Sequence, residues 1–128
     1  MVQEVSQEIR RFILTSIPSV PHLEAIVLLR QEANRSWSGE TLARFLYISE
    51  AKADAILLEL KQAGIVVSDE KGAPAYRYLP ASDKLREQID VVAAIYPKNV
   101  VEITNLIHSS SKNKVQQFAD AFKLRKDV

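Results

Sequence analysis

The stretch that decides the fold is residues 37–66, WSGETLARFLYISEAKADAILLELKQAGIV. Ser38 and Ser49 each precede a run of residues whose apolar members recur at helical spacing, and serine is a favoured helix N-cap. Only Tyr47 and Ile48 separate the two runs. Gly64 follows the second run, and glycine suits the left-handed conformation that commonly ends a helix. The stretch therefore predicts two short helices joined by a tight turn.

A β-hairpin is predicted directly after these helices. Residues 65–67 (IVV) and 76–79 (YRYL) favour strands, and the turn-prone segment 68–75 between them contains Gly72 and Pro74. Pro80 then limits the second strand.

Helices are also predicted on both sides of this region. Residues 2–13 and 21–30 carry apolar residues at helical spacing, and Pro18 and Pro21 separate the two segments. After the hairpin, Ser82 opens a helix that Pro97 stops, and Asn99 with Glu102 resembles a capping box at the start of the next one. A last helix is predicted after Ser111. The expected order is four helices, a hairpin and three helices.

The bulk properties favour one globular domain without catalytic machinery. The chain has 128 residues, 47% of them hydrophobic and 26% charged, which predicts a single folded domain over residues 1–128. Cysteine is absent, which excludes disulfides and thiolate metal ligands and fits a reducing cytoplasm. No apolar run approaches the length of a membrane span. The chain has only three glycines, so no glycine-rich nucleotide loop is expected. Its two histidines lie 86 positions apart, and no catalytic site, metal site or cofactor is expected.

The pattern in residues 37–66 resembles the helix-turn-helix of winged-helix regulators. In that family a Leu-Ala pair buries the first helix, an Ile-Ser step makes the turn, and a closing Leu with Ala-Gly leads into the wing; Leu42, Ala43, Ile48, Ser49, Leu60, Ala63 and Gly64 occupy these positions. By helix order alone, the flanks resemble a MarR-like arrangement. The resemblance implies a mainly α fold with a small β-hairpin wing. Its helix-turn-helix spans about 38–64, its wing about 65–80 and its C-terminal helical region about 82–124.

The resemblance also implies a DNA-binding transcriptional regulator that acts as a homodimer, with a recognition helix from each subunit in successive major grooves of double-stranded DNA. Arg44, Lys52 and Arg77 are expected to position the domain on phosphates. The full expected set of DNA-binding residues is Arg44, Ser49, Glu50, Lys52, Asp54, Ala55, Lys71 and Arg77.

A second function stays open, because the charges near the inferred recognition helix are partly acidic. Net charge is only +1, and Glu50 and Asp54 lie on the face that would meet the groove, where base readout usually uses Arg, Lys, Asn or Gln. The wing tip adds Asp69 and Glu70 beside Lys71. The alternative is a winged-helix module that binds a protein partner instead of DNA. Its contact residues would be Glu50, Ala51, Asp54, Ala55 and Leu58.

The tryptophan, the other aromatic residues and the C-terminal basic residues are expected mainly to have structural roles. Trp37 is expected to pack in the core beside the wing. A set of aromatic residues is a weaker candidate for lining a small-molecule pocket: Phe45, Tyr47, Tyr76, Tyr78 and Tyr96. The basic residues near the C-terminus are expected to be solvated.

Overall fold

The computed structural model describes residues 5–69 and 74–109. These described residues divide into two compact units, one within 21–94 and the other within 5–20 and 95–109. Each unit is described by itself, and the single domain expected from the sequence stays a prediction.

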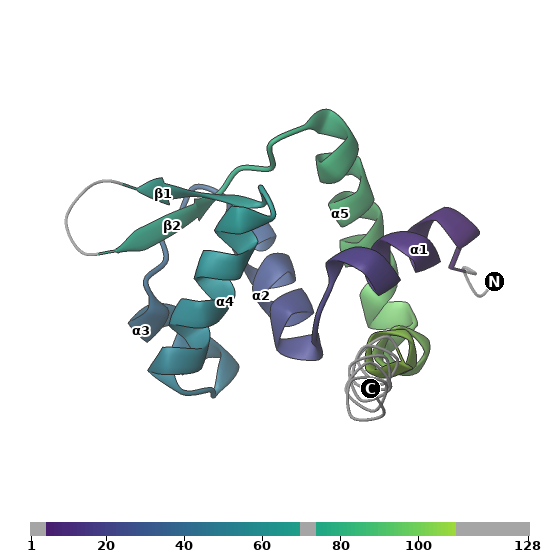
Figure 1. The fold of residues 1–128 in the computed structure, drawn as a ribbon, viewed down its shortest axis with the longest axis horizontal. Helices are drawn as coiled ribbons and strands as arrows, with labels where there is room; N and C mark the ends of the chain where they lie inside the picture. Colours follow the sequence, from purple (N-terminus) through teal and green to yellow (C-terminus); the bar gives the residue numbers. More distant parts are fainter. Residues whose placement is uncertain (1–4, 70–73, 110–128) are drawn as a thin grey trace, which may run out of the picture. The chain divides into compact units, whose positions relative to one another are not determined.

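The unit of residues 21–94 contains the predicted helix-turn-helix and hairpin (Figure 1). Its helices are α2 (Val20–Gln31), α3 (Gly39–Leu46), α4 (Glu50–Gln62) and α5 (Asp83–Ile95), and its strands are β1 (Val66–Asp69) and β2 (Ala75–Tyr78). The predicted N-caps are confirmed: the hydroxyls of Ser38, Ser49 and Ser82 accept hydrogen bonds from the backbone N–H groups three residues later. Gly64 has a φ of 79° directly after α4, as a glycine at a helix end commonly does.

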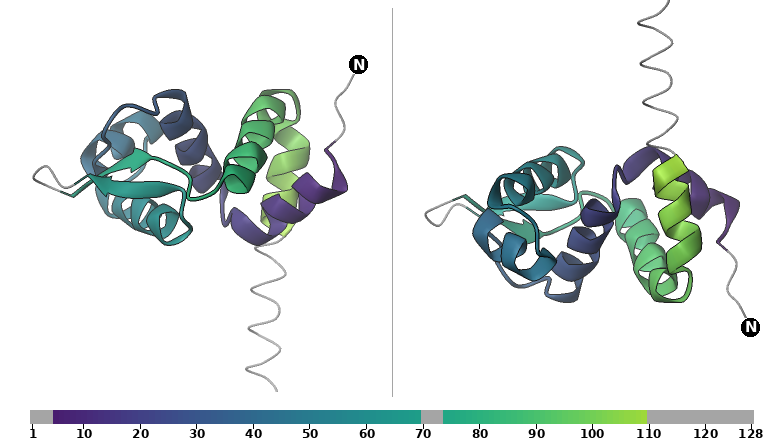
Figure 2. Two further views of the ribbon diagram at one scale, coloured as in Figure 1. Left: turned by 90° about the horizontal axis from the view of Figure 1, so that it is seen from above. Right: turned by 90° about the horizontal axis from the view of Figure 1, so that it is seen from below.

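The hairpin is antiparallel, and its strands differ slightly from those predicted, since Ser68, Asp69 and Ala75 also pair while Ile65 and Leu79 lie just outside the strands. Its register sets Val66 opposite Tyr78 and Val67 opposite Arg77. Trp37 adds a short third pairing, because its backbone N–H and carbonyl both bond to Tyr76 at 2.7 Å. Figure 2 shows the hairpin and its neighbouring helices from two further directions. The segment before α3 is thereby fixed to the wing, and the expected place of Trp37 beside the wing is confirmed.

A continuous set of apolar side chains holds this unit together. Its fully buried members on the helix-turn-helix and its neighbours include Leu23, Trp37, Leu42, Ala53 and Leu57. Burying one large apolar side chain contributes about 1.5–3 kcal/mol, so α3 and α4 owe their stability mainly to this packing and not to helix propensity.

The second unit contains α1 (Gln7–Ser16), the short 3₁₀ helix η1 (Tyr96–Lys98) and a helical segment at residues 100–109. Ser6 caps α1 by accepting from the Ile9 N–H at 3.2 Å. Arg10 of α1 donates to Glu102 at 2.5 Å, so these two segments, far apart in sequence, lie side by side.

The predicted capping box at Asn99 and Glu102 is wrong. The Asn99 side-chain amide donates backwards to the Ile95 carbonyl at 3.0 Å, and the Glu102 carboxylate binds Arg10. Neither side chain therefore makes the reciprocal bonds of a capping box. The last predicted helix, after Ser111, lies outside the described residues.

No single described helix is long and apolar enough to cross a membrane, although α1 and α2 pass a test of length and composition when taken as a broken pair.

Candidate nucleic-acid interface

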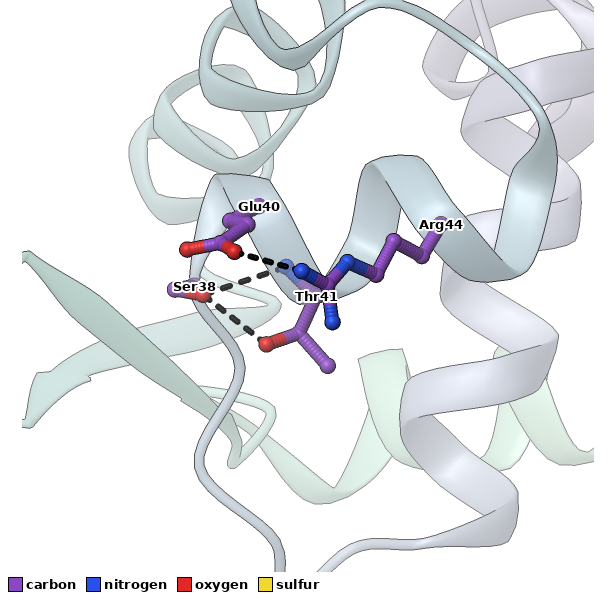
Figure 3. Close-up of polar contacts among 4 residues, drawn as sticks. All are labelled: Ser38, Glu40, Thr41 and Arg44. Atoms are coloured by element: carbon purple, nitrogen blue, oxygen red, sulfur yellow. Dashed lines mark hydrogen bonds and ion pairs between the residues drawn. The ribbon is translucent and has the colours of Figure 1, made fainter.

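The N-terminus of α3 is closed by a small polar network (Figure 3). The Ser38 hydroxyl accepts from the Thr41 backbone N–H at 3.2 Å and lies 2.9 Å from the Thr41 hydroxyl. One turn on, Arg44 donates to Glu40 at 2.8 Å. Both side chains of this ion pair are largely exposed, and exposed pairs of this kind contribute little to stability. Breaking this ion pair therefore costs little free energy, and Arg44 can exchange Glu40 for another anion.

The turn between α3 and α4 holds Tyr47 in an unusual conformation. Its backbone has φ 55° and ψ 45°, the left-handed region that residues other than glycine rarely adopt. The Ile48 N–H donates to the Ala43 carbonyl at 3.2 Å and closes the turn. The Tyr47 side chain is 95% exposed, so packing within the chain does not offset this strain.

One face of α4 packs in the core and the opposite face meets solvent. The Ser49 hydroxyl accepts from the Lys52 N–H at 3.1 Å and fixes the start of the helix. The buried face consists of Ala53, Ile56, Leu57 and Leu60. The exposed positions in its first three turns are Glu50, Ala51, Lys52, Asp54, Ala55, Leu58 and Glu59. The residues expected from the sequence to meet a partner are thus solvent-exposed.

Asp54 of α4 lies against α3, a contact that the sequence did not suggest. A Cβ built on Gly39 would overlap the Asp54 carboxylate, so this carboxylate lies directly against the first residue of α3. The N-terminus of a helix carries a partial positive charge, which stabilises a nearby carboxylate. Part of the negative charge on α4 is therefore compensated within the domain.

The wing contributes Arg77, whose side chain is exposed on β2. Lys71, the other wing residue expected to contact DNA, lies outside the described residues. Among the described residues, Lys52 and Arg77 have no ion-pair partner, unlike Arg44. Glu59 pairs with His22 at 2.7 Å, and His22 is largely buried.

A cation–π cluster next to the helix-turn-helix was missed by the sequence analysis. The Arg35 guanidinium lies 4.4 Å from the centre of the Trp37 ring and 5.2 Å from the Phe45 ring, and the two rings meet edge to face. Phe45 nevertheless stays 49% exposed. No pattern in the sequence links these positions, because contact between them requires the turn before α3.

Comparison with known proteins adds a structural similarity. No protein-family model matches the chain, and no curated protein sequence matches it. The structure is similar to that of reduced HlyU from Vibrio cholerae N16961, with a TM-score of 0.53 and 17% sequence identity, covering 70% of this chain and 90% of that one.

The fold is that of a winged helix. At this level of identity the similarity concerns the fold alone, and it does not single out the MarR-like arrangement inferred for the flanks. In winged-helix terms, α3 is the first helix of the helix-turn-helix, α4 occupies the position of the recognition helix, and β1 with β2 forms the wing. The fold class predicted from the sequence is confirmed.

Proposed function

We propose that this chain is a DNA-binding transcriptional regulator whose α4 helix enters the major groove. The observation that carries the proposal is the solvent-exposed N-terminal half of α4, next to a wing, in a winged-helix fold. The small side chains of Ala51 and Ala55 allow this half of the helix to approach base edges closely.

Three basic residues on different elements serve as phosphate contacts in this proposal. Lys52 near the start of α4 and Arg77 on β2 are exposed and unpaired among the described residues, and Arg44 is held only by its exposed partner Glu40. Phosphate contacts of this kind orient a protein on the duplex without reading its sequence. Ser49 and Glu50 start the helix that reads the bases, and the compensation of Asp54 at Gly39 reduces its repulsion from phosphates.

The regulator acts as a homodimer in this proposal. Val100 and Val101 are exposed on the helical segment at residues 100–109, and pairing of such residues between subunits would remove them from water. Sedimentation equilibrium tests this point directly, with Val101→Lys as the variant expected to yield monomers. A native protein that is monomeric at micromolar concentration would contradict the dimer and leave DNA binding as a separate question.

Fluorescence anisotropy with a random DNA duplex, repeated over a series of salt concentrations, tests DNA binding. Release of counterions makes the logarithm of affinity fall linearly with the logarithm of salt concentration. Lys52→Gln and Arg77→Gln should each lower the steepness of this dependence by about one unit. Lys84→Gln removes the same charge from α5, outside the helix-turn-helix and the wing, and serves as the matched control. Absence of binding at low salt would contradict the proposal.

A module that binds a protein is the second candidate, and a specific observation favours it. Phe45, Tyr47 and Leu58 are exposed large apolar side chains on α3, the turn and α4, and large exposed apolar groups often mark protein interfaces. Leu58→Asp separates the two functions. In the DNA-binding protein this variant weakens DNA affinity through added negative charge, so Leu58→Asn should restore it. In a protein-binding module both variants should disrupt the complex.

A further inference from the structure

An open pocket lies at the end of α2, the end of β2 and the start of α5, away from the face of α4. Its volume is about 570 Å³, within the range of small-molecule sites. All its lining residues belong to the unit of residues 21–94. Among the described residues, the lining includes the arginines Arg30, Arg77 and Arg86 and the acid Asp90. The printed lining therefore carries more basic than acidic groups, although Asp90 pairs with Arg30 and Asp83 lies beside Arg86.

Much of the hydrogen-bonding capacity of these arginines is unused. Arg30 donates to Asp90 at 2.8 Å through its Nε, and its two terminal amino groups have no partner among the described residues. Arg86 lies 3.6 Å from Asp83, an ion pair too long for a hydrogen bond. Arg77 is unpaired. A guanidinium presents its donors in a planar fork that matches a carboxylate, so these groups are suited to an anion.

A buried hydroxyl beside the arginines also lacks a partner. Tyr78 lines the pocket and is only 7% exposed, and its hydroxyl oxygen makes no hydrogen bond to any of the described residues. Arg30, Arg86 and Asp90 are near enough to act electrostatically on this hydroxyl. A buried polar group without a partner costs about 1–3 kcal/mol, and a ligand that bonds to it would remove that cost. The site thus combines unused donors at the rim with an unsatisfied group beneath it.

We propose that this pocket binds a small organic anion, with a carboxylate held by Arg30 and Arg86 and an apolar part against Leu79 and Pro80. The two apolar residues line the same pocket, so the site offers both a charged and an uncharged region. Contact between the ligand and the buried Tyr78 hydroxyl requires a guanidinium to shift aside, and the Tyr78 variant below tests that contact. The pocket contains no residue of α4, but it shares Arg77 with the proposed phosphate contacts.

Titration of the full chain with three probes, followed by NMR of the arginine Nε–H groups, tests this site. The probes are 2-naphthoate, its neutral amide 2-naphthamide, and inorganic phosphate. We expect 2-naphthoate to shift the Arg30 and Arg86 signals saturably and at least tenfold more tightly than either other probe. The amide lacks the charge, and phosphate lacks the apolar part. Equal affinity for the acid and the amide, or no saturable shift with the acid, would overturn the proposal.

Variants of the chain provide a second test of the anion site. Arg86→Gln should weaken 2-naphthoate binding at least tenfold, whereas Lys84→Gln, which removes an equal charge from α5 outside the lining, should leave it within twofold. Tyr78→Phe should weaken binding severalfold without lowering the thermal midpoint of the free protein, because it removes an unsatisfied hydroxyl and keeps the ring. If Arg86→Gln weakens binding to duplex DNA but leaves 2-naphthoate binding unchanged, the arginines serve DNA and the proposal fails.

Discussion

Replacing Tyr47 with asparagine should stabilise the protein, although no contact is added. The left-handed backbone costs a residue with a Cβ atom about 1–2 kcal/mol, and asparagine tolerates this region far better than tyrosine. Because Tyr47 is 95% exposed, losing its ring removes almost no buried apolar area. We therefore expect Tyr47→Asn to raise the free energy of unfolding by about 1 kcal/mol.

The size of the expected thermal shift follows from chain length. For 128 residues, the unfolding entropy per residue makes 1 kcal/mol equal to about 3–4 °C in the thermal midpoint. Circular dichroism melts of the native protein, Tyr47→Asn and Tyr47→Ala measure it. The alanine variant is the control, since it removes the ring but keeps the Cβ atom in the strained conformation, and its midpoint should stay near the native value. Equal midpoints for the asparagine and alanine variants would refute the reasoning from strain.

The same variants report on function, because strain retained at an exposed position often reflects a binding role. If Tyr47 contacts the bound duplex, both Tyr47→Asn and Tyr47→Ala should weaken DNA binding, whatever their effects on stability.

Three further predictions concern the cap, the core and the buried hydroxyl. Ser49→Ala should lower the free energy of unfolding by about 1 kcal/mol in urea titrations, and Ser49→Asp should restore most of it; equal losses in both variants would contradict the capping role. Leu57→Ala, which empties a fully buried position, should cost about 3–5 kcal/mol, whereas the exposed Leu58→Ala should cost less than about 1 kcal/mol. Burial, and then the nearby Asp90 carboxylate, raise the pKa of Tyr78 above its ordinary value, so the unfolded chain loses this proton at lower pH than the folded one. The free energy of unfolding should be unaffected below about pH 10 and should decline as pH rises from there towards the folded pKa of Tyr78. In urea titrations over this pH range, the midpoint should decline less for Tyr78→Phe than for the native protein. Identical pH profiles for the two proteins would show that the Tyr78 hydroxyl is not responsible.

Local signals in the sequence were sufficient for the helix-turn-helix. Ser38 and Ser49 act within three residues of themselves, and Gly64 acts through its own backbone, so neighbouring residues carry the information. At Asn99 and Glu102 the same kind of signal failed. Arg10, 92 positions away, binds the Glu102 carboxylate, and a rule based on spacing cannot include that competitor.

The pocket could not be predicted for a related reason. Arg30, Tyr78 and Arg86 come from α2, β2 and α5, and only the folded chain brings them together. Of the aromatic residues considered for a small-molecule site, Tyr78 does line this pocket, whereas Phe45 and Tyr47 are exposed on the helix-turn-helix. The residues proposed to contact DNA were named from the resemblance to winged-helix regulators, and their role stays a prediction.

The close approach of Gly39 and Asp54 ties together two positions that are 15 residues apart in the chain. Any side chain at position 39 would displace the carboxylate, which would then turn towards the outer face of α4 and add negative charge there. Substitutions at the two sites should therefore be non-additive: Gly39→Ala should have a small effect on stability, because the exposed Asp54 side chain can rotate away, and this effect should be smaller still beside alanine at position 54. In a survey of natural variants, the same dependence would make the two positions change together.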